Sequence, residues 1–142
     1  MGLNAAESII ADLGKPHLDF YEQRVDLAAA FRTFARLNMH EGVANHFSLV
    51  VECDADQKPT KVLINPANRA FQNIKASDLL VMDVSSKDAI MREVANFEYK
   101  KDDRRATIDP TAICIHGFLH LQHPSANCII HLHPQYSTAL SC

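Results

Sequence analysis

The sequence predicts a mixed α/β domain whose sheet is built mainly from β-hairpins rather than from regular β-α-β units. Three observations support this prediction. The 142 residues suffice for one domain with a hydrophobic core. The spacing of apolar residues changes from helical to short β-rich runs and back to helical. Polar turns, such as the one over 54–59, join neighbouring β-rich runs directly. We therefore expect a helix, several strands, a second helix, a strand and the start of a last helix.

The first half of the chain supplies the first helix and a hairpin. Residues 1–20 are expected to form an N-terminal extension, and the domain to occupy 21–142. From Tyr21 to about Met39 apolar residues recur every three or four positions, which is typical of an amphipathic helix. The short β-rich runs at 47–51 and 61–65 are then predicted to pair as a hairpin.

The second half is predicted from turn and capping signals. A turn cluster covers 65–68, a short helical turn begins at 77–78, and the apolar run 79–83 suits a strand in the middle of a sheet. The charged segment 85–109 shows no clear period, so we expect a loop that includes at most one strand. The remaining elements are a helix that starts at Asp109-Pro110 and stops before Pro124, a strand over 127–133 and helical turns over 135–141.

Composition excludes several classes of function. A net charge of -3 provides no broad basic surface, so nucleic acid is an unexpected partner. No run approaches the roughly 20 apolar residues that a membrane span needs, and the N-terminus lacks a secretory signal. The four cysteines are far apart and form no CxxC motif, which favours reduced thiols and a cytoplasmic location.

The most specific local motif is the pair His131 and His133. Residues two apart in a strand project from the same face, so two imidazoles can converge on one ion. Zinc accepts imidazole nitrogen, and catalytic zinc usually has three protein ligands, so a third ligand is required. The alternative is that both histidines form a polar edge of a strand. A second histidine set, His116, His120 and His123, follows helical spacing, and for it a buried or capping role is favoured.

Two turns carry groups suited to a substrate. The segment 42–48 offers backbone N–H groups together with Asn45, His46 and Ser48, which could hold an anion or a polyol, or form an ordinary turn. Asn68 lies in the second turn. Both turns would serve one pocket only if the fold brings them together.

Four ordered blocks, at 42–49, 63–83, 109–117 and 129–141, resemble the class II aldolase and adducin N-terminal domain family. The resemblance covers the chain from about Tyr21 to Cys142, and favours the adducin-like bacterial branch. It implies a three-layer α/β/α sandwich around a mainly antiparallel sheet, incomplete here at the C-terminus, and a homo-oligomer that is a tetramer in the family.

The resemblance also implies a zinc site with three histidines. Its first two ligands fall on His131 and His133, and the third would lie beyond Cys142, absent from this chain. The aldolases carry a glutamate nineteen residues before the first histidine, where this sequence has Ala112. The family's phosphate-binding Gly-Asn pair falls on Ala44-Asn45 or, shifted by one, on Asn45-His46.

Two functions follow as hypotheses. The first is zinc-dependent lyase or epimerase-type chemistry on a small hydroxy-carbonyl or sugar phosphate, with His131 and His133 on the metal and with Asn45, His46, Ser48 and Asn68 near the substrate. The alternative is a noncatalytic adducin-like domain for assembly or ligand binding, which Ala112 favours. An amidohydrolase barrel, which also carries two such histidines, needs about 250 residues and is excluded by length.

Overall fold

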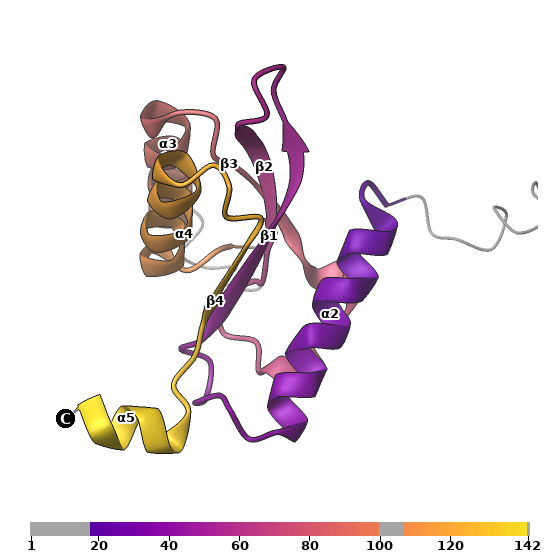
Figure 1. Cartoon of the computed structure of the whole chain (residues 1–142), viewed down its shortest axis with the longest axis vertical. Helices are drawn as coiled ribbons and strands as arrows, with labels where there is room; N and C mark the ends of the chain where they lie inside the picture. Colours follow the sequence, from indigo (N-terminus) through magenta and orange to yellow (C-terminus); the bar gives the residue numbers. More distant parts are fainter. Residues whose placement is uncertain (1–17, 100–106, 142) are drawn as a thin grey trace, which may run out of the picture.

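A computed structural model describes residues 18–99 and 107–141. Helix α2 (Tyr21–Arg36) covers one face of the sheet, while α3 (Lys87–Tyr99) and α4 (Pro110–Gln122) cover the other (Figure 1). The described part of the chain therefore confirms the predicted α/β fold with its three layers. The remaining elements in chain order are β1 (His46–Cys53), β2 (Pro59–Ile64), η1 (Phe71–Asn73), η2 (Ala76–Asp78), β3 (Leu80–Asp83), β4 (Cys128–His131) and α5 (Gln135–Ser141).

The sheet is antiparallel throughout its described strands, in the order β3-β2-β1-β4. The predicted hairpin over β1 and β2 is confirmed, with Ser48 opposite Ile64. On the other side of β1, His46 lies directly opposite His131 and Ser48 lies opposite Ile129. Because directly opposite residues share a face, this register places two of the predicted site histidines next to each other.

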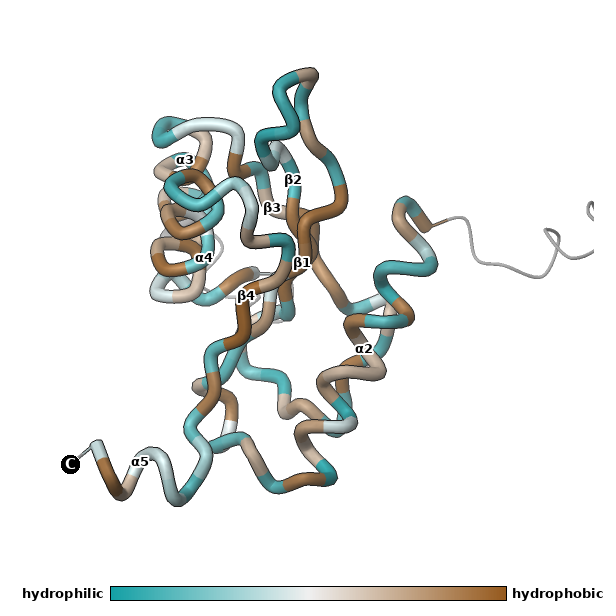
Figure 2. Tube along the Cα trace, viewed as in Figure 1, coloured by the Kyte–Doolittle hydropathy of each residue, from teal (hydrophilic) through white to brown (hydrophobic). Residues whose placement is uncertain are grey.

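Alternation along the strands divides the apolar core in two. Odd positions of β1, such as Phe47, pack with Leu27 and Phe31 of α2. The opposite face carries Val62 and Ile64 of β2, which pack with α3 and α4. The hydrophobic colouring follows the middle of the sheet, while the tip of the β1–β2 hairpin is largely hydrophilic (Figure 2). The period of two in the strands therefore assigns His46 and Ser48 to the α4 side.

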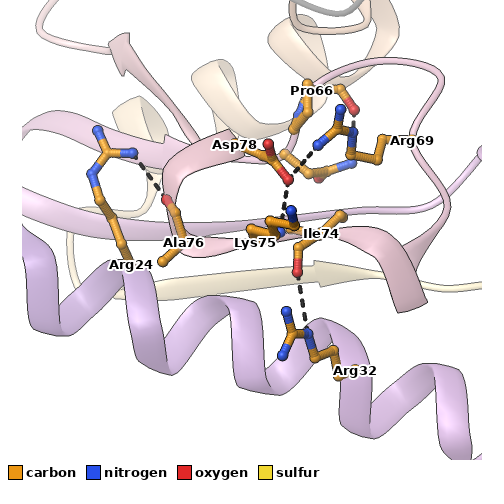
Figure 3. A network of polar contacts seen from close by, with 9 residues as sticks. Arg24, Arg32, Pro66, Arg69, Ile74, Lys75, Ala76 and Asp78 are labelled. Atoms are coloured by element: carbon orange, nitrogen blue, oxygen red, sulfur yellow. Dashed lines mark hydrogen bonds and ion pairs between the residues drawn. The ribbon is translucent and has the colours of Figure 1, made fainter. Parts of the chain in front are cut away.

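Polar contacts fix α2 against the segment that precedes β3 (Figure 3). Arg24 donates to the carbonyl of Leu79 at 2.6 Å and to that of Ala76 at 3.4 Å, while Arg32 donates to the carbonyl of Ile74 at 3.3 Å. Arg24 is buried, so these carbonyls take the place of water around its guanidinium. These hydrogen bonds fix the position of α2 over the sheet.

Three sequence predictions were wrong in detail. The first helix ends at Arg36 rather than near Met39, because Asn38 adopts a left-handed conformation with φ 54°. The predicted loop over 85–109 contains α3 instead, whose apolar residues Ile90, Val94 and Phe97 recur at helical spacing that the charged flanks obscured.

The strand at 79–83 is at an edge of the described sheet, not in its middle. Leu79 and Met82 are nevertheless buried in the two separate cores, while Val81 between them is exposed. Of the predicted N-terminal extension, residues 1–17 lie outside the described residues. No helix in the described ranges has both the length and the apolar composition of a membrane span.

Candidate metal and substrate site

Five histidines from β1, α4 and the end of β4 form one connected group, which we call the histidine network. His46 comes from β1, His116 and His120 from α4, and His131 and His133 from β4 and the segment after it. The network includes two further side chains, Ser48 and Glu41.

The inner half of the network consists of His120, Ser48, His116 and His46. Helix α4 supplies His116 and His120, and the start of this helix is well defined. Asp109 caps the helix by accepting hydrogen bonds from the backbone N–H groups of Thr111 and Ala112, and Pro110 occupies the first turn. His116 and His120, one turn apart, then lie on the same face and point at β1. Both are fully buried, as the sequence analysis favoured.

The inner half is a continuous chain of hydrogen bonds. Nδ1 of His120 lies 2.9 Å from the carbonyl oxygen of Ala126, and its Nε2 lies 2.8 Å from Oγ of Ser48. Ser48 Oγ lies 2.5 Å from Nδ1 of His116, whose Nε2 lies 2.6 Å from Nδ1 of His46. Each buried polar atom of this chain therefore has a partner.

The outer half contains the two predicted metal ligands. The rings of His46 and His131 stack with centroids 4.5 Å apart. Nε2 of His131 lies 2.9 Å from Nε2 of His133, and Nδ1 of His133 lies 2.8 Å from Oε2 of Glu41. The strand itself ends at His131, two residues earlier than predicted, yet the two imidazoles still converge.

Burial keeps the inner histidines neutral. Loss of solvent, reinforced by neighbouring imidazoles, lowers the pKa of His116 to about 3. The same causes lower the pKa of His46 to about 4, against a small opposing effect of Asp109. Burial also lowers the pKa of His120 and of His131. These four histidines are therefore uncharged bases near neutral pH.

The other predicted substrate residues lie in two places. Asn45 is buried beside the network, where its Oδ1 accepts from the backbone N–H of Glu41 at 2.6 Å. Its Nδ2 is a buried donor without a hydrogen-bond partner among the described residues. Asn68 is exposed in its turn, with φ 57°, and lines a different hollow of 470 Å³ together with Arg32 and Arg69.

A cavity of 390 Å³ adjoins the outer end of the network. Its lining includes His40, Glu41, His133 and Thr138. The cavity lies where the segment after α2 meets the start of α5, and α5 itself projects away from the sheet (Figure 1). A small molecule in this cavity would reach the exposed side of His133.

Ala112 occupies the position of the aldolase glutamate in the resemblance, and its side chain faces the core. It is 1% exposed and packs in the cluster that contains Ile90 and Ile113. Among the described residues, no group of three or more His, Cys, Asp or Glu side chains is arranged to hold a metal ion. The two imidazoles of His131 and His133 are a partial ligand set.

Sequence reasoning missed the contacts of Ser48, His120 and Glu41. A signal was available for the first two, since His46 and Ser48 are two apart on a strand while His116 and His120 are four apart on a helix. Each pair therefore presents one face, and the two faces can meet. Glu41 gave no signal, because its contact with His133 depends on the path of an irregular segment.

Comparison with known proteins identifies the class of fold. An aldolase II superfamily protein of Pseudomonas syringae superposes with a TM-score of 0.67 at 24% identity, over 93% of this chain and 47% of that one. The L-fuculose 1-phosphate aldolase of Glaciozyma antarctica gives a TM-score of 0.64 at 22% identity, over 94% and 50%. These likenesses show that this chain shares its fold with the two proteins.

The sequence matches the family described as Class II Aldolase and Adducin N-terminal domain over residues 25–142, and the chain belongs to this family. A Pseudomonas aeruginosa protein with the provisional name aldolase class 2 protein PA3430 is 30% identical over 122 residues. The adducin-related protein C1289.14 of Schizosaccharomyces pombe is 28% identical over 120 residues. Their matches cover 86% and 84% of this chain, which spans 40% and 34% of the lengths of these relatives.

Proposed function

We propose that this domain binds zinc or another divalent ion through His131 and His133 and serves lyase or epimerase-type chemistry on a small hydroxy-carbonyl or sugar phosphate. The observation that carries the proposal is the 2.9 Å approach of the two Nε2 atoms. Two ligands at 2.0–2.1 Å from a tetrahedral ion are about 3.3 Å apart, so a small opening of this pair suits zinc. In the family resemblance the third ligand comes from beyond Cys142.

Glu41 supports this assignment from behind His133. A carboxylate that accepts from Nδ1–H of an imidazole leaves a lone pair on Nε2, and this arrangement is common around metal-bound histidine. The 2.8 Å contact between Glu41 and His133 has this form. It fixes which nitrogen of His133 is available to an ion.

The remaining residues suit a polar substrate. Nδ2 of Asn45 is a buried donor without a partner among the described residues, and we propose that it donates to a phosphate or hydroxyl oxygen of a sugar phosphate once the surrounding segment opens to admit it. His46 stacks on His131 and so lies next to the proposed ligands. A bound divalent ion would supply Lewis-acid polarisation of a carbonyl or hydroxyl oxygen. Ser48 is fully buried, so we propose that it acts through His116 and His120; Asn68 stays a prediction.

The second candidate is a noncatalytic adducin-like domain for assembly or ligand binding. Ala112 is the observation that favours it, because a methyl group in the core replaces the carboxylate of the aldolases. The convergence of His131 and His133, the proposed metal ligands, favours the first candidate. A homo-oligomer and a cytoplasmic location stay predictions of the sequence.

Zinc titration of the metal-free 142-residue chain tests the proposal. Calorimetry is expected to show binding at one site, weak because two imidazoles hold the ion, and lost by at least tenfold in a His131→Ala, His133→Ala double variant. The matched control is His123→Ala, an exposed histidine after α4, which is expected to leave the affinity unchanged. Equal binding by all three chains would refute the site and favour the noncatalytic candidate.

A further inference from the structure

The hydrogen bonds of the inner network have only one consistent direction. The carbonyl oxygen of Ala126 can only accept, so Nδ1 of His120 carries the hydrogen of that 2.9 Å contact. At pH 7.5, above the ordinary histidine pKa of about 6.5, the ring is neutral and its Nε2 holds a lone pair. This lone pair accepts from the hydroxyl of Ser48 at 2.8 Å.

The same reasoning fixes the direction of the hydrogen bonds from Ser48 through His116 to His46. The serine hydroxyl has a single hydrogen, and it is already donated to His120. Its oxygen therefore accepts from Nδ1–H of His116 at 2.5 Å, which leaves a lone pair on Nε2 of that ring. This second lone pair accepts from Nδ1–H of His46 at 2.6 Å.

We propose that His120, Ser48 and His116 are positioning residues that lock His46 in its Nδ1–H tautomer, so that its Nε2 is a permanent hydrogen-bond acceptor in the site. The inference rests on the proposed function for its role, since the donor facing Nε2 would be a hydroxyl group of the hydroxy-carbonyl substrate. The main-chain carbonyl of Ala126 sets this preference, because its oxygen can only accept a hydrogen bond. It lies more than 70 positions along the chain from His46.

The lock also explains why three polar side chains are buried together without an acid. A chain of neutral donors and acceptors that starts at a carbonyl satisfies every inner atom without a net charge. Ser48 and both helix histidines are completely buried, and His46 is 5% exposed. In such surroundings a reversed tautomer would leave one contact with two hydrogens or with none, at a cost of a buried unsatisfied group.

Nitrogen NMR of the ¹⁵N-histidine-labelled 142-residue chain, without metal, tests the lock directly. Two-bond couplings from the ring hydrogens distinguish a protonated Nδ1 from a protonated Nε2, and single His→Gln variants assign the signals. We expect His46, His116 and His120 each to be a single Nδ1–H tautomer at pH 7.5. An Nε2–H form of any of the three in the unaltered chain would overturn the proposal, whatever a variant does.

The Ser48→Ala variant separates a positioning role from a merely structural one. It is expected to leave the backbone amide spectrum largely in place while His116 and His46 change to a mixture of tautomers, because the link to Ala126 is cut. A single Nδ1–H tautomer of His46 that persists in this variant would overturn the proposal. Ser137→Ala, on exposed α5, is the matched control and is expected to change no tautomer.

Zinc added to the labelled chain distinguishes this inference from the metal proposal. Nε2 of His131 and of His133 is expected to shift on coordination, while His46 keeps its tautomer and shows no coordination shift. Direct coordination by His46 would overturn its role as an acceptor. Failure of every histidine to respond to zinc would refute the metal site alone, because the tautomers are measured without metal.

Discussion

Acid is expected to destabilise the fold through His116, and the size of the effect follows from its burial. Its pKa falls from the ordinary 6.5 to about 3 because the ring is buried among other imidazoles. Below pH 6.5 the unfolded chain gains a proton that the folded chain does not bind. The free energy of unfolding therefore falls as the pH falls from 6.5 toward 3. Between pH 7.5 and 5 this one residue is expected to remove about 2 kcal/mol.

Urea unfolding at pH 7.5, 6 and 5 measures this loss, and a His116→Gln variant isolates it. The variant is expected to be less stable at pH 7.5, since Ser48 and His46 lose a partner, but its stability should decline with acid by about 2 kcal/mol less than that of the unaltered chain. His123→Gln, which removes an exposed histidine, is the control and should keep the full decline. Equal declines in the unaltered and His116→Gln chains would refute the reasoning.

Three further predictions concern α4 and the outer end of the network. Gly117→Ala is expected to destabilise the chain by about 1 kcal/mol, because the added Cβ would lie 2.9 Å from Cγ2 of fully buried Ile90, a clash of about 2 kcal/mol that exceeds the helix-propensity gain of about 1. Thermal unfolding measures it, and no loss would show that Ile90 can move. Ala112→Glu should lower the free energy of unfolding by about 3 kcal/mol, since an unpaired carboxylate would enter the core. At high pH this loss should exceed that of Ala112→Gln, because only the glutamate carries a charge. An unchanged midpoint would show that the position faces the site. Glu41→Gln is expected to weaken zinc binding about tenfold in calorimetry, and equal affinity would remove Glu41 from the site.

Whether a segment forms a helix or a strand could largely be predicted from its local sequence pattern. The position of a strand within the sheet could not. The cap at Asp109, the hairpin turn and the short α5 depend on neighbouring residues, and the structure places each where the sequence indicated. In the run 79–83, Leu79 enters one core and Met82 the other, although strands of the described sheet do not flank the run on both sides. Which strand lies at an edge depends on pairings far along the chain, and no local period reports it.

The same distinction applies to the site. His131 and His133 were found because their spacing is short and has a direct geometric meaning. The contact between His46 and His116 spans 70 positions and joins a strand to a helix, so it required the register of β1 against β4 and the rotation of α4. The sequence favoured a buried role for His116 and His120 but could not connect them to Ser48.

The electrostatics of the network point to its outer end as the place for a cation. The inner chain ends on a carbonyl and contains neutral imidazoles, so it neither needs nor stabilises a positive charge. Glu41 is the carboxylate hydrogen-bonded to the network among the described residues, and it contacts His133. An ion between His131 and His133 would lie on that side. Because the inner chain is neutral, His46 would place no positive charge next to this ion. In these proposals the two halves have different roles. The outer half would attract a cation, and the inner half would orient His46 so that its Nε2 accepts a hydrogen bond.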